Sequence, residues 1–442
     1  MSDPLRRVPR RPVDLDGAMA RGGLVVATFA AVAGAARLAQ DAAIAWRFGA
    51  GSAVDAYYFV LSLYTVPVAV ALSTLTLLMG PAQELIDKVH PGGRQQFQRE
   101  CLGAVMVLAV LCLPLAWWSM GAVVGSQWSG LGEVTAEQAT QGLPAIVLAV
   151  PFGLLGALFS AWLVAEGRHV LALLEALPPL VLVLVVLLAP TSSLYWATAV
   201  GVTLQLLAMA LALHLRGLVW SPSWEFRSPA WRGFARNGFA LLVAQLLFAL
   251  IPLIDPLFAV RVGEGALSAL SFANRLVLGL QGLAGLALQR ASLPLLAALA
   301  SAEPAQALRA ALRWALMAAL LGGLVGLIVA ACADPLVSAL FERGSFTVAD
   351  RVEVAGLLRF GMLQMPAFLA GTVLATALAA ARGGLHLILA AMLGLAVKVL
   401  ASYVLVAHWG VEGLMLSTAL MYSATSLLAW WALRLHLQRR TT

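Results

Sequence analysis

Twelve apolar runs, each long enough to cross a lipid bilayer, occupy most of this 442-residue chain. A spanning helix needs about 20 apolar residues, because hydrocarbon offers no water to the backbone and only a helix or a closed barrel satisfies it. Only 11% of the residues are charged, against about 25% in soluble domains. The sequence therefore predicts an all-α polytopic membrane protein of about 12 transmembrane helices and excludes a soluble enzyme. The runs are about 22–48, 54–80, 101–124, 142–166, 170–190, 194–215, 238–260, 267–297, 311–333, 353–381, 386–407 and 411–435.

Basic residues gather on one side of this predicted topology. Numbered from a cytoplasmic N-terminus, the segments on that side carry nineteen Lys and Arg, whereas the opposite side carries only Arg261, Arg343 and Arg351. Positive charge stays on the cytoplasmic side during insertion. We therefore expect a multi-pass protein of a bacterial inner membrane with an uncleaved first span and both termini in the cytoplasm. Topology explains the basic excess, so no nucleic-acid partner is expected.

One polar motif occurs twice at nearly half-chain spacing. The pattern Asp-x3-Ala-x-Arg-x-Gly-x-Gly begins at Asp41 and again at Asp255, 214 residues later. Six spans separate the copies, and an even number gives both halves the same direction, which predicts two parallel-repeat six-helix lobes. The predicted divisions are a cytoplasmic basic tail (1–21), an N-lobe (22–215), a cytoplasmic linker (216–237), a C-lobe (238–435) and a cytoplasmic tail (436–442).

Ionisable residues within the spans are concentrated in corresponding helices of the two halves. Each costs roughly 2.5–3.5 kcal/mol to insert, so it faces a wet cavity or a partner. Arg37 and Asp41 are four residues apart and can pair on one helix face, and a pair between Asp255 and Lys398 is geometrically possible. Cations outnumber anions, which favours an anionic ligand such as a diphosphate, whose oxygens the guanidinium fork binds bidentately.

Catalytic motifs are absent from the sequence. No Gly-x4-Gly-Lys-Ser/Thr loop is present, and the six histidines have no metal-ligand spacing. The predicted outer loops leave no room for a folded catalytic domain. We therefore expect a transporter with no catalytic residues, no metal and no cofactor.

Several stretches resemble one transporter family. Residues 45–58, AWRFGAGSAVDAYY, resemble the junction of the first two spans in the MurJ/MviN family of lipid II flippases, within the multidrug/oligosaccharidyl-lipid/polysaccharide (MOP) exporter superfamily. Residues 271–276, 292–296 and 340–347 look like the same family at matching places, and the resemblance runs from about residue 22 to 435.

The resemblance implies a V-shaped pair of lobes around a central cationic cavity that works by alternating access. Asp55 and Arg275 match positions that are functional in the family. The candidates for binding substrate in the cavity are Arg37, Asp55, Arg275, Arg47 and Arg261, and the candidates for ion coupling or a structural role are Asp41, Asp255 and Lys398.

The leading hypothesis is a flippase for an undecaprenyl-diphosphate-linked saccharide, either lipid II or a related polysaccharide precursor. Two places where the family usually has arginine hold Gln40 and Gly34 here. These departures leave open an exopolysaccharide or O-antigen repeat-unit flippase, or a non-transporting scaffold for cell-wall or polysaccharide synthesis enzymes. A drug antiporter of the MATE type is less favoured. The expected partners are the polyprenyl-diphosphate-linked saccharide and membrane lipids.

Overall fold

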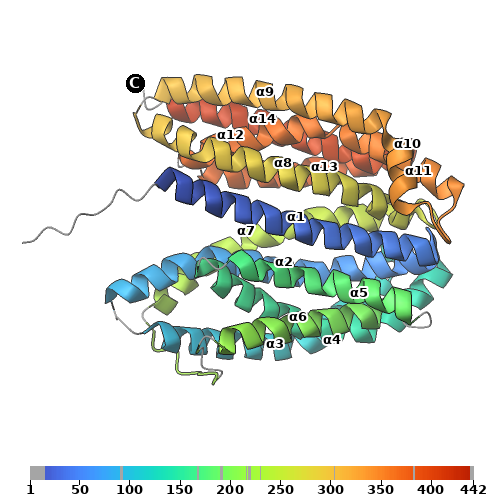
Figure 1. Ribbon diagram of the computed structural model, residues 1–442, viewed down its shortest axis with the longest axis horizontal. Coiled ribbons are helices and arrows are strands. Elements are labelled where there is room, and N and C mark those ends of the chain that lie inside the picture. The colour runs from blue at the N-terminus through green and yellow to red at the C-terminus, as the bar shows by residue number, and fades with distance from the viewer. Residues whose placement is uncertain are drawn as a thin grey trace, which may run out of the picture.

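The computed structural model describes residues 15–89, 93–166, 169–189, 193–215, 217, 221–228, 230–302, 304–381 and 384–438. Over these ranges the chain forms fourteen α-helices and two 3-10 helices, with no strand (Figure 1). The helices are α1 (Leu15–Phe48), α2 (Ser52–Val89), α3 (Arg94–Val124), η1 (Gln127–Ser129), α4 (Glu133–Ala165), η2 (His169–Ala176), α5 (Leu177–Leu188), α6 (Leu194–His214), α7 (Ala230–Ala259), α8 (Ala266–Ala302), α9 (Pro304–Ala331), α10 (Ala333–Phe341), α11 (Val348–Met362), α12 (Met365–Ala380), α13 (Gly384–Trp409) and α14 (Glu412–Gln438).

Nine helices of the described chain are long and apolar enough to cross a bilayer. Helices α11 and α12 together form a tenth span, bent by 40°. The two remaining runs predicted from the sequence coincide with α1 and with the shorter apolar helix Leu173–Leu188. The expected all-helical polytopic fold is therefore confirmed, although fewer than twelve single helices meet the length and composition of a span.

Local sequence explains where the broken span starts and bends. At its start, Thr347 and Asp350 form a capping box, in which each side chain accepts a hydrogen bond from the other residue's backbone N–H. At its break, Pro366 lies in the first turn of α12 and has no N–H to donate to Met362 one turn earlier. The helical ladder is interrupted there, and the chain turns through residues 363–364.

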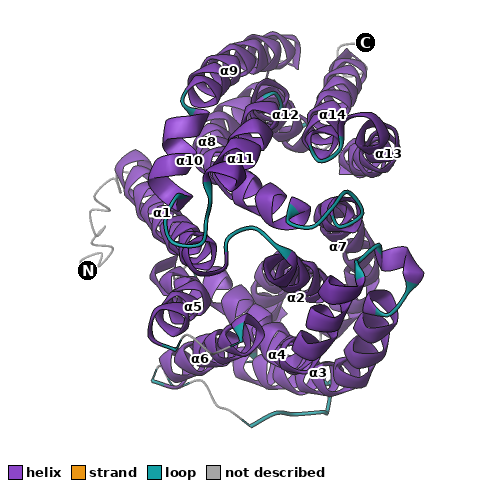
Figure 2. Ribbon diagram, turned by 90° about the vertical axis from the view of Figure 1, so that its right-hand side faces the viewer, coloured by secondary structure: helices purple, strands orange, loops and turns teal. Residues whose placement is uncertain are grey.

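The packing partners of the helices repeat between the two halves of the chain. In the first half, α4 packs against α2, α3 and α6, and in the second half α12 packs against α8, α9 and α14 (Figure 2). Helices α5 and α6 form a pair, as do α13 and α14. Helix α1 packs against α5 of its own half and α8 of the other, whereas α7 packs against α13 of its own half and α2 of the other. This correspondence bears out the predicted parallel repeat.

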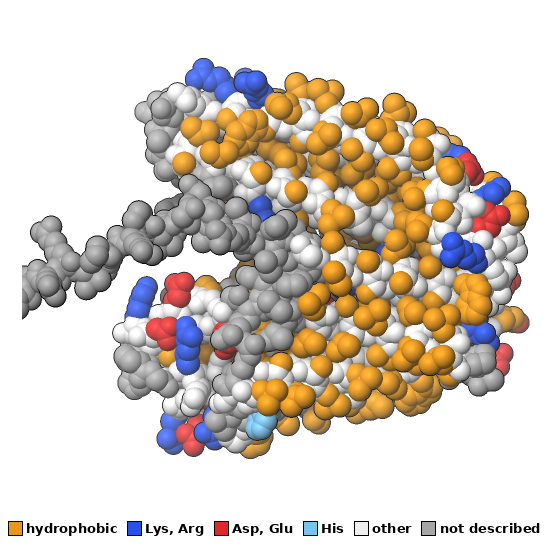
Figure 3. Space-filling view, in the orientation of Figure 1, with side chains coloured by type: hydrophobic (Ala, Val, Ile, Leu, Met, Phe, Trp, Pro, Cys, Tyr) orange, Lys and Arg blue, Asp and Glu red, His pale blue; other side chains and the backbone are white. Residues whose placement is uncertain are grey.

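Large apolar side chains cover the outside of the bundle. Leu320, Leu324 and Leu327 lie three or four residues apart on α9 and are 56–70% exposed. In Figure 3 apolar side chains cover the middle of the visible face, and charged side chains gather toward its left and right ends. A surface of this kind is matched to hydrocarbon in its middle and to water at its two ends.

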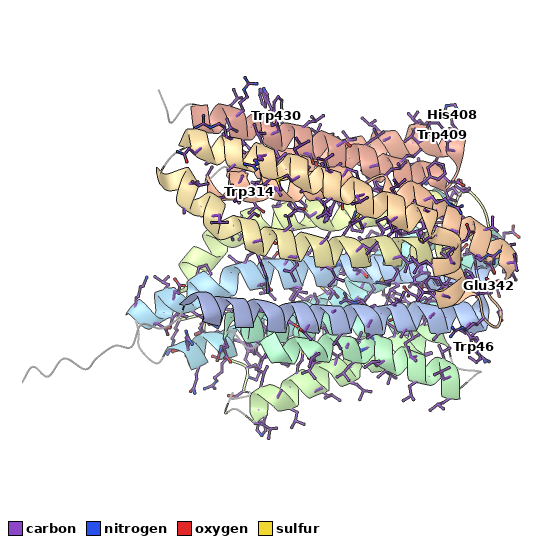
Figure 4. All side chains as sticks on the ribbon, turned by 45° about the horizontal axis from the view of Figure 1, so that its top comes forward. Trp46, Trp314, Glu342, His408, Trp409 and Trp430 are labelled. Carbon is purple, nitrogen blue, oxygen red and sulfur yellow. The ribbon has the colours of Figure 1, made fainter. Side chains whose placement is uncertain are left out.

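The two ends of the bundle differ in how their halves meet. We call the end with residues 49–51, 260–265 and 342–347 the latch end, and the end with residues 221–228 the linker end. In Figure 3 the upper and lower parts of the molecule join at the right, at the latch end, and diverge toward the left. Figure 4 places Trp46, Glu342 and Trp409 near the latch end, and Trp314 and Trp430 toward the other end. Tryptophan is enriched at membrane–water interfaces, and these positions suit two such zones.

Candidate functional site

Two cavities lie between the helices and share part of their lining. The first-half cavity, about 480 Å³, is lined by α1, α2, α4, η2, α5 and α6, and by Arg275 of α8. The central cavity, about 380 Å³, is lined mainly by α2, α7, α8, α13 and α14. Leu61 and Thr65 of α2 and Arg275 of α8 line both cavities. Arg275 therefore lies where the two cavities meet.

Arg275 links the two halves through an ion pair. Its Nε donates to Oδ2 of Asp41 on α1, and Tyr58 Oη donates to the other carboxylate oxygen of Asp41 at 2.9 Å. Asp41 is fully buried, whereas the Arg275 side chain is 30% exposed. A guanidinium has five N–H donors, and within the described chain no other hydrogen bond engages this one. Its remaining donors are available to an anion in the cavities.

The expected pair between Arg37 and Asp41 is not what the structure shows. Both oxygens of Asp41 are engaged by Arg275 and Tyr58, because the packing of α1 against α8 brings Arg275 to it. Arg37 instead lines the first-half cavity together with Arg275, and its charge interacts with that of Glu175 on η2. Arg37 and Arg275 are thus the two predicted arginines that line the first-half cavity.

The pair between Asp255 and Lys398, which the sequence allowed, is present. Lys398 Nζ on α13 lies 2.5 Å from Asp255 Oδ1 on α7. The same ammonium donates to Leu414 O, Ser417 Oγ and Thr418 Oγ1 on α14, at 3.1, 3.0 and 2.6 Å. Lys398 is buried and ties three helices together beside the central cavity. Among the described residues no cluster of three His, Cys, Asp or Glu could hold a metal ion.

Asp55 lies outside these two cavities and lines a third, latch-end cavity of about 420 Å³. It is 1% exposed at the start of α2, and its carboxylate accepts hydrogen bonds from Gly265 N at 2.7 Å and Ser268 N at 2.6 Å. These amides are at the N-terminus of α8, whose unpaired N–H groups and dipole attract a carboxylate. Asp55 therefore caps a helix of the opposite half and fastens the latch end.

A second contact at the latch end joins α1 to the loop before α11. Ser345 N donates to Trp46 O at 2.7 Å, and Ser345 Oγ donates to Arg47 O at 2.9 Å. Gly49 and Gly344 both have positive φ, at +66° and +64°, which only glycine adopts at low cost. A Cβ on Gly344 would lie 2.1 Å from Trp46 O, so the close approach of the two segments requires glycine.

Two further acidic residues of the latch end, Glu342 and Glu264, contact neighbouring segments. A hydrogen bond with Ser338 and the neighbouring Arg351 hold the pKa of Glu342 below its ordinary value. Glu264 accepts a hydrogen bond from Ser52 N at 3.3 Å, which adds another link from α2 to the segment before α8. These contacts join α2 to the segment before α8, and the end of α10 to the first turn of α11.

Arg47 and Arg261 also lie at the latch end, outside the first-half and central cavities, and Arg261 lines the separate latch-end cavity together with Asp55. Arg47 accepts the Ser345 hydrogen bond through its carbonyl. Arg261 donates to Trp128 O at 2.5 Å and lies over the ring of Phe258. Both follow the repeated Asp by six residues, which is nearly two helical turns and places them at the helix end rather than beside the cavities.

Sequence reasoning missed Glu100, which anchors the linker. This buried carboxylate on α3 accepts hydrogen bonds from Arg227 N at 2.9 Å, Ser228 N at 3.3 Å and Trp231 Nε1 at 2.6 Å. Gly103, one turn further along, leaves room for Ser223 O, which would lie 2.4 Å from a Cβ there. The sequence signal that could have identified Glu100 is its place at the edge of an apolar run. A carboxylate buried there needs several hydrogen-bond donors.

Solved structures of transporters share this arrangement. A structure of lipid II flippase MurJ in the inward closed conformation matches with a TM-score of 0.77 and 14% identity, over 93% of this chain and 87% of that one. An inward-facing MATE family multidrug transporter of the MOP superfamily matches at 0.73 and 12%, over 92% and 95%. A MOP superfamily transporter from Pyrococcus furiosus matches at 0.64 and 12%, over 96% and 97%. The fold is therefore shared with solved structures of transporters, two of which are described as members of the MOP superfamily.

The sequence comparison narrows this class to one family. The family model for lipid II flippase MurJ matches residues 44–441, and the chain belongs to this family. A probable lipid II flippase MurJ from Bdellovibrio bacteriovorus is 27% identical over 225 residues, which are 51% of this chain and 43% of that protein. The match thus spans less than half of the curated relative's length.

Proposed function

We propose that this protein is a flippase that moves an undecaprenyl-diphosphate-linked saccharide, lipid II or a related polysaccharide precursor, from the inner to the outer leaflet of the inner membrane. The observation that carries the proposal is the placement of Arg275 at the junction of two cavities, with most of its donors available. A diphosphate is the ligand that a guanidinium fork binds bidentately. Membership of the lipid II flippase family supports the same substrate class.

We infer the orientation of the protein in the membrane from the distribution of its charges. The basic linker end faces the cytoplasm with both termini, and the latch end faces outward. In the present conformation the latch end is fastened by the contacts of Asp55 and Ser345, while the halves diverge at the linker end. A headgroup enters from the cytoplasmic side, and the polyprenyl tail stays in lipid.

The protein's own residues lower the barrier to this movement. Carrying a diphosphate through hydrocarbon without a partner is prohibitive, since burying an unpaired charge costs many kcal/mol. Arg275 and Arg37 supply opposite charge within the membrane. An anion that binds Arg275 competes with Asp41 for the same guanidinium and so weakens a contact between the halves. Release of that contact permits the halves to rock, with the latch opening next. No bond is made or broken in the substrate.

Transport in proteoliposomes tests the proposal. Arg275→Ala should slow the flipping of fluorescent lipid II by about 10–100-fold, because a hydrogen bond to a charged group contributes about 1.5–3 kcal/mol. The matched control is Arg359→Ala, since Arg359 also pairs with a carboxylate, Asp334, but lines neither cavity. Unchanged transport by Arg275→Ala refutes the role of Arg275.

A depletion experiment addresses the cargo in cells. Loss of the protein should cause a polyprenyl-linked saccharide to accumulate in the inner leaflet. Lipid II accumulation assigns the protein to the cell wall, and another polyprenyl saccharide assigns it to polysaccharide export. Accumulation of neither contradicts the flippase proposal.

A further inference from the structure

The first-half cavity contains more polar lining than a site for two phosphates requires. Besides Arg37 and Arg275 it is lined by Gln40 on α1, Glu175 on η2 and Gln205 on α6. Its volume of about 480 Å³ falls within the roughly 300–1,000 Å³ of small-molecule sites. The cavity lies within the first half rather than between the halves, and it meets the central cavity only where Arg275, Leu61 and Thr65 line both.

Three polar side chains of this cavity have no hydrogen-bond partner among the described residues. Gln40 and Tyr64 are each 8% exposed, and Gln205 is half-buried. All three line the cavity. Buried amides and hydroxyls are nearly always hydrogen-bonded, since each unpaired group costs about 1–3 kcal/mol. Their donors and acceptors are therefore directed toward a ligand or water in the cavity.

The charges of the cavity are arranged for a ligand that is anionic at one end and neutral at the other. Arg275 stands at the junction with the central cavity, and Arg37 and Glu175 interact electrostatically within the lining. A carboxylate disfavours a second anionic group nearby but accepts hydrogen bonds from hydroxyls. Tyr64 and Phe152 add aromatic rings to the same walls.

We propose that the first-half cavity receives the saccharide of the cargo, whose diphosphate is held by Arg275 and Arg37. This inference rests on the proposed function and assigns the substrate class of this cavity. In a lipid-linked saccharide the first sugar is bonded directly to the diphosphate, so its site must adjoin the phosphate site, as this cavity adjoins Arg275. Sugar hydroxyls satisfy the amides of Gln40 and Gln205, and the C–H faces of a sugar ring pack on the aromatic rings.

Other occupants fit the lining less well. A polyprenyl tail would leave Gln40, Gln205 and Tyr64 unpaired, at the cost given above. Free phosphate would satisfy the arginines but not the acceptor carboxylate of Glu175. Only a ligand that carries phosphate at one end and many hydroxyls at the other satisfies both parts.

A cavity-filling variant tests the inference. Gly156 on α4 lines the cavity, and a Cβ there would have no atom within 4 Å. Gly156→Leu therefore adds a side chain to the cavity wall at a position where its Cβ meets no neighbouring atom, and it raises helix propensity. Gly121→Leu on α3 is the matched control, since its Cβ is equally unobstructed and Gly121 lines none of the described cavities.

The measurement compares two probes, lipid II and bare undecaprenyl diphosphate, in binding to the full chain in detergent. We expect the wild type and Gly121→Leu to bind lipid II about tenfold more tightly than the bare diphosphate, as one or two hydrogen bonds provide. Gly156→Leu should lose this preference and keep its affinity for the bare diphosphate. Gln205→Leu replaces the amide with an apolar side chain of similar size. It should lower the preference for lipid II by about fivefold, the effect of one lost hydrogen bond.

The outcomes separate this inference from the proposed function. Equal binding of the two probes by the wild type overturns the saccharide site, and so does a preference that survives in both Gly156→Leu and Gln205→Leu. In each of these cases diphosphate binding stands, and with it the flippase proposal. If the wild type binds neither probe, the proposed function fails and the saccharide site fails with it.

Discussion

Replacing Lys398 with methionine removes the ammonium that ties α7, α13 and α14 together, while keeping a side chain of similar length. The variant leaves Asp255 without its counter-charge and Leu414 O, Ser417 Oγ and Thr418 Oγ1 without their shared donor. Because Lys398 is 1% exposed, water cannot replace the lost ammonium at its own position. We expect the variant to insert and fold with lower thermal stability.

The size of the loss follows from the contacts. Removing one partner of a buried ion pair costs about 3–5 kcal/mol, and the 18% exposure of the Asp255 side chain favours the lower end of this range. Unfolding entropy is about 2.1 cal/mol/K per residue. For 442 residues that unfold as one unit this gives about 0.9 kcal/mol/K. Lys398→Met should therefore lower Tm by about 3–5 °C.

The assay is thermal unfolding of the purified protein in detergent, in the form of a double-mutant cycle with Asp255→Asn. The double variant has no unpaired charge, so it should regain about half of the Tm lost by Lys398→Met. Lys88→Met, at the exposed end of α2, is the control for loss of a lysine and should leave Tm unchanged. If the double variant loses the sum of the two single losses, the side chains are not coupled and the pair does not hold these helices.

Three further variants probe the two ends of the bundle. Gly344→Ala should speed hydrogen exchange at residues 342–347, because its positive φ costs about 1–3 kcal/mol for alanine and its Cβ would strike Trp46 O. Asp55→Asn should lower Tm by about 2 °C, since an amide replaces one of the two carboxylate oxygens that cap α8. Glu100→Gln should expose residues 221–228 to proteolysis, because only one of its two acceptor oxygens remains for the linker.

Matched variants distinguish these effects from general damage. Gly356→Ala, at a glycine of α11 with ordinary φ and no atom near its Cβ, should leave exchange unchanged. Asp87→Asn breaks an exposed pair with Arg94, which contributes about 0–1 kcal/mol, and Glu84→Gln alters an exposed carboxylate of α2. If a variant and its control respond equally, the role assigned to the contact that the variant removes is wrong.

The repeat could be predicted from the sequence, but the contacts between the halves could not. The motif repeated at Asp41 and Asp255 predicted that two helices end alike. The positions of Asp255 and Lys398 within their spans allowed these two residues to pair. The same local reasoning paired Asp41 with Arg37, whereas its partner Arg275 is 234 residues away. Asp55 likewise finds its donors 210 and 213 residues away. Which helices of the two halves contact each other, and at which end of the bundle, depends on packing that sequence periodicity does not encode.

The two repeated aspartates take on different tasks because their cations come from different places. Asp255 pairs with Lys398 of its own half. That lysine is 1% exposed and donates three hydrogen bonds to α14. Asp41 pairs with Arg275 of the opposite half, whose side chain is 30% exposed and lines both cavities. In the movement proposed above, the first pair would stay within one half, whereas the second, which joins the two halves, would be strained or broken. Lys398 lines the central cavity as well, but its three hydrogen bonds to α14 occupy its donors, whereas Arg275 keeps donors for an anionic ligand. Under the proposed function, the repeated motif thus provides one ion pair held within a half and one contact between the halves that cargo can weaken, so that binding at Arg275 would bias the position of the halves.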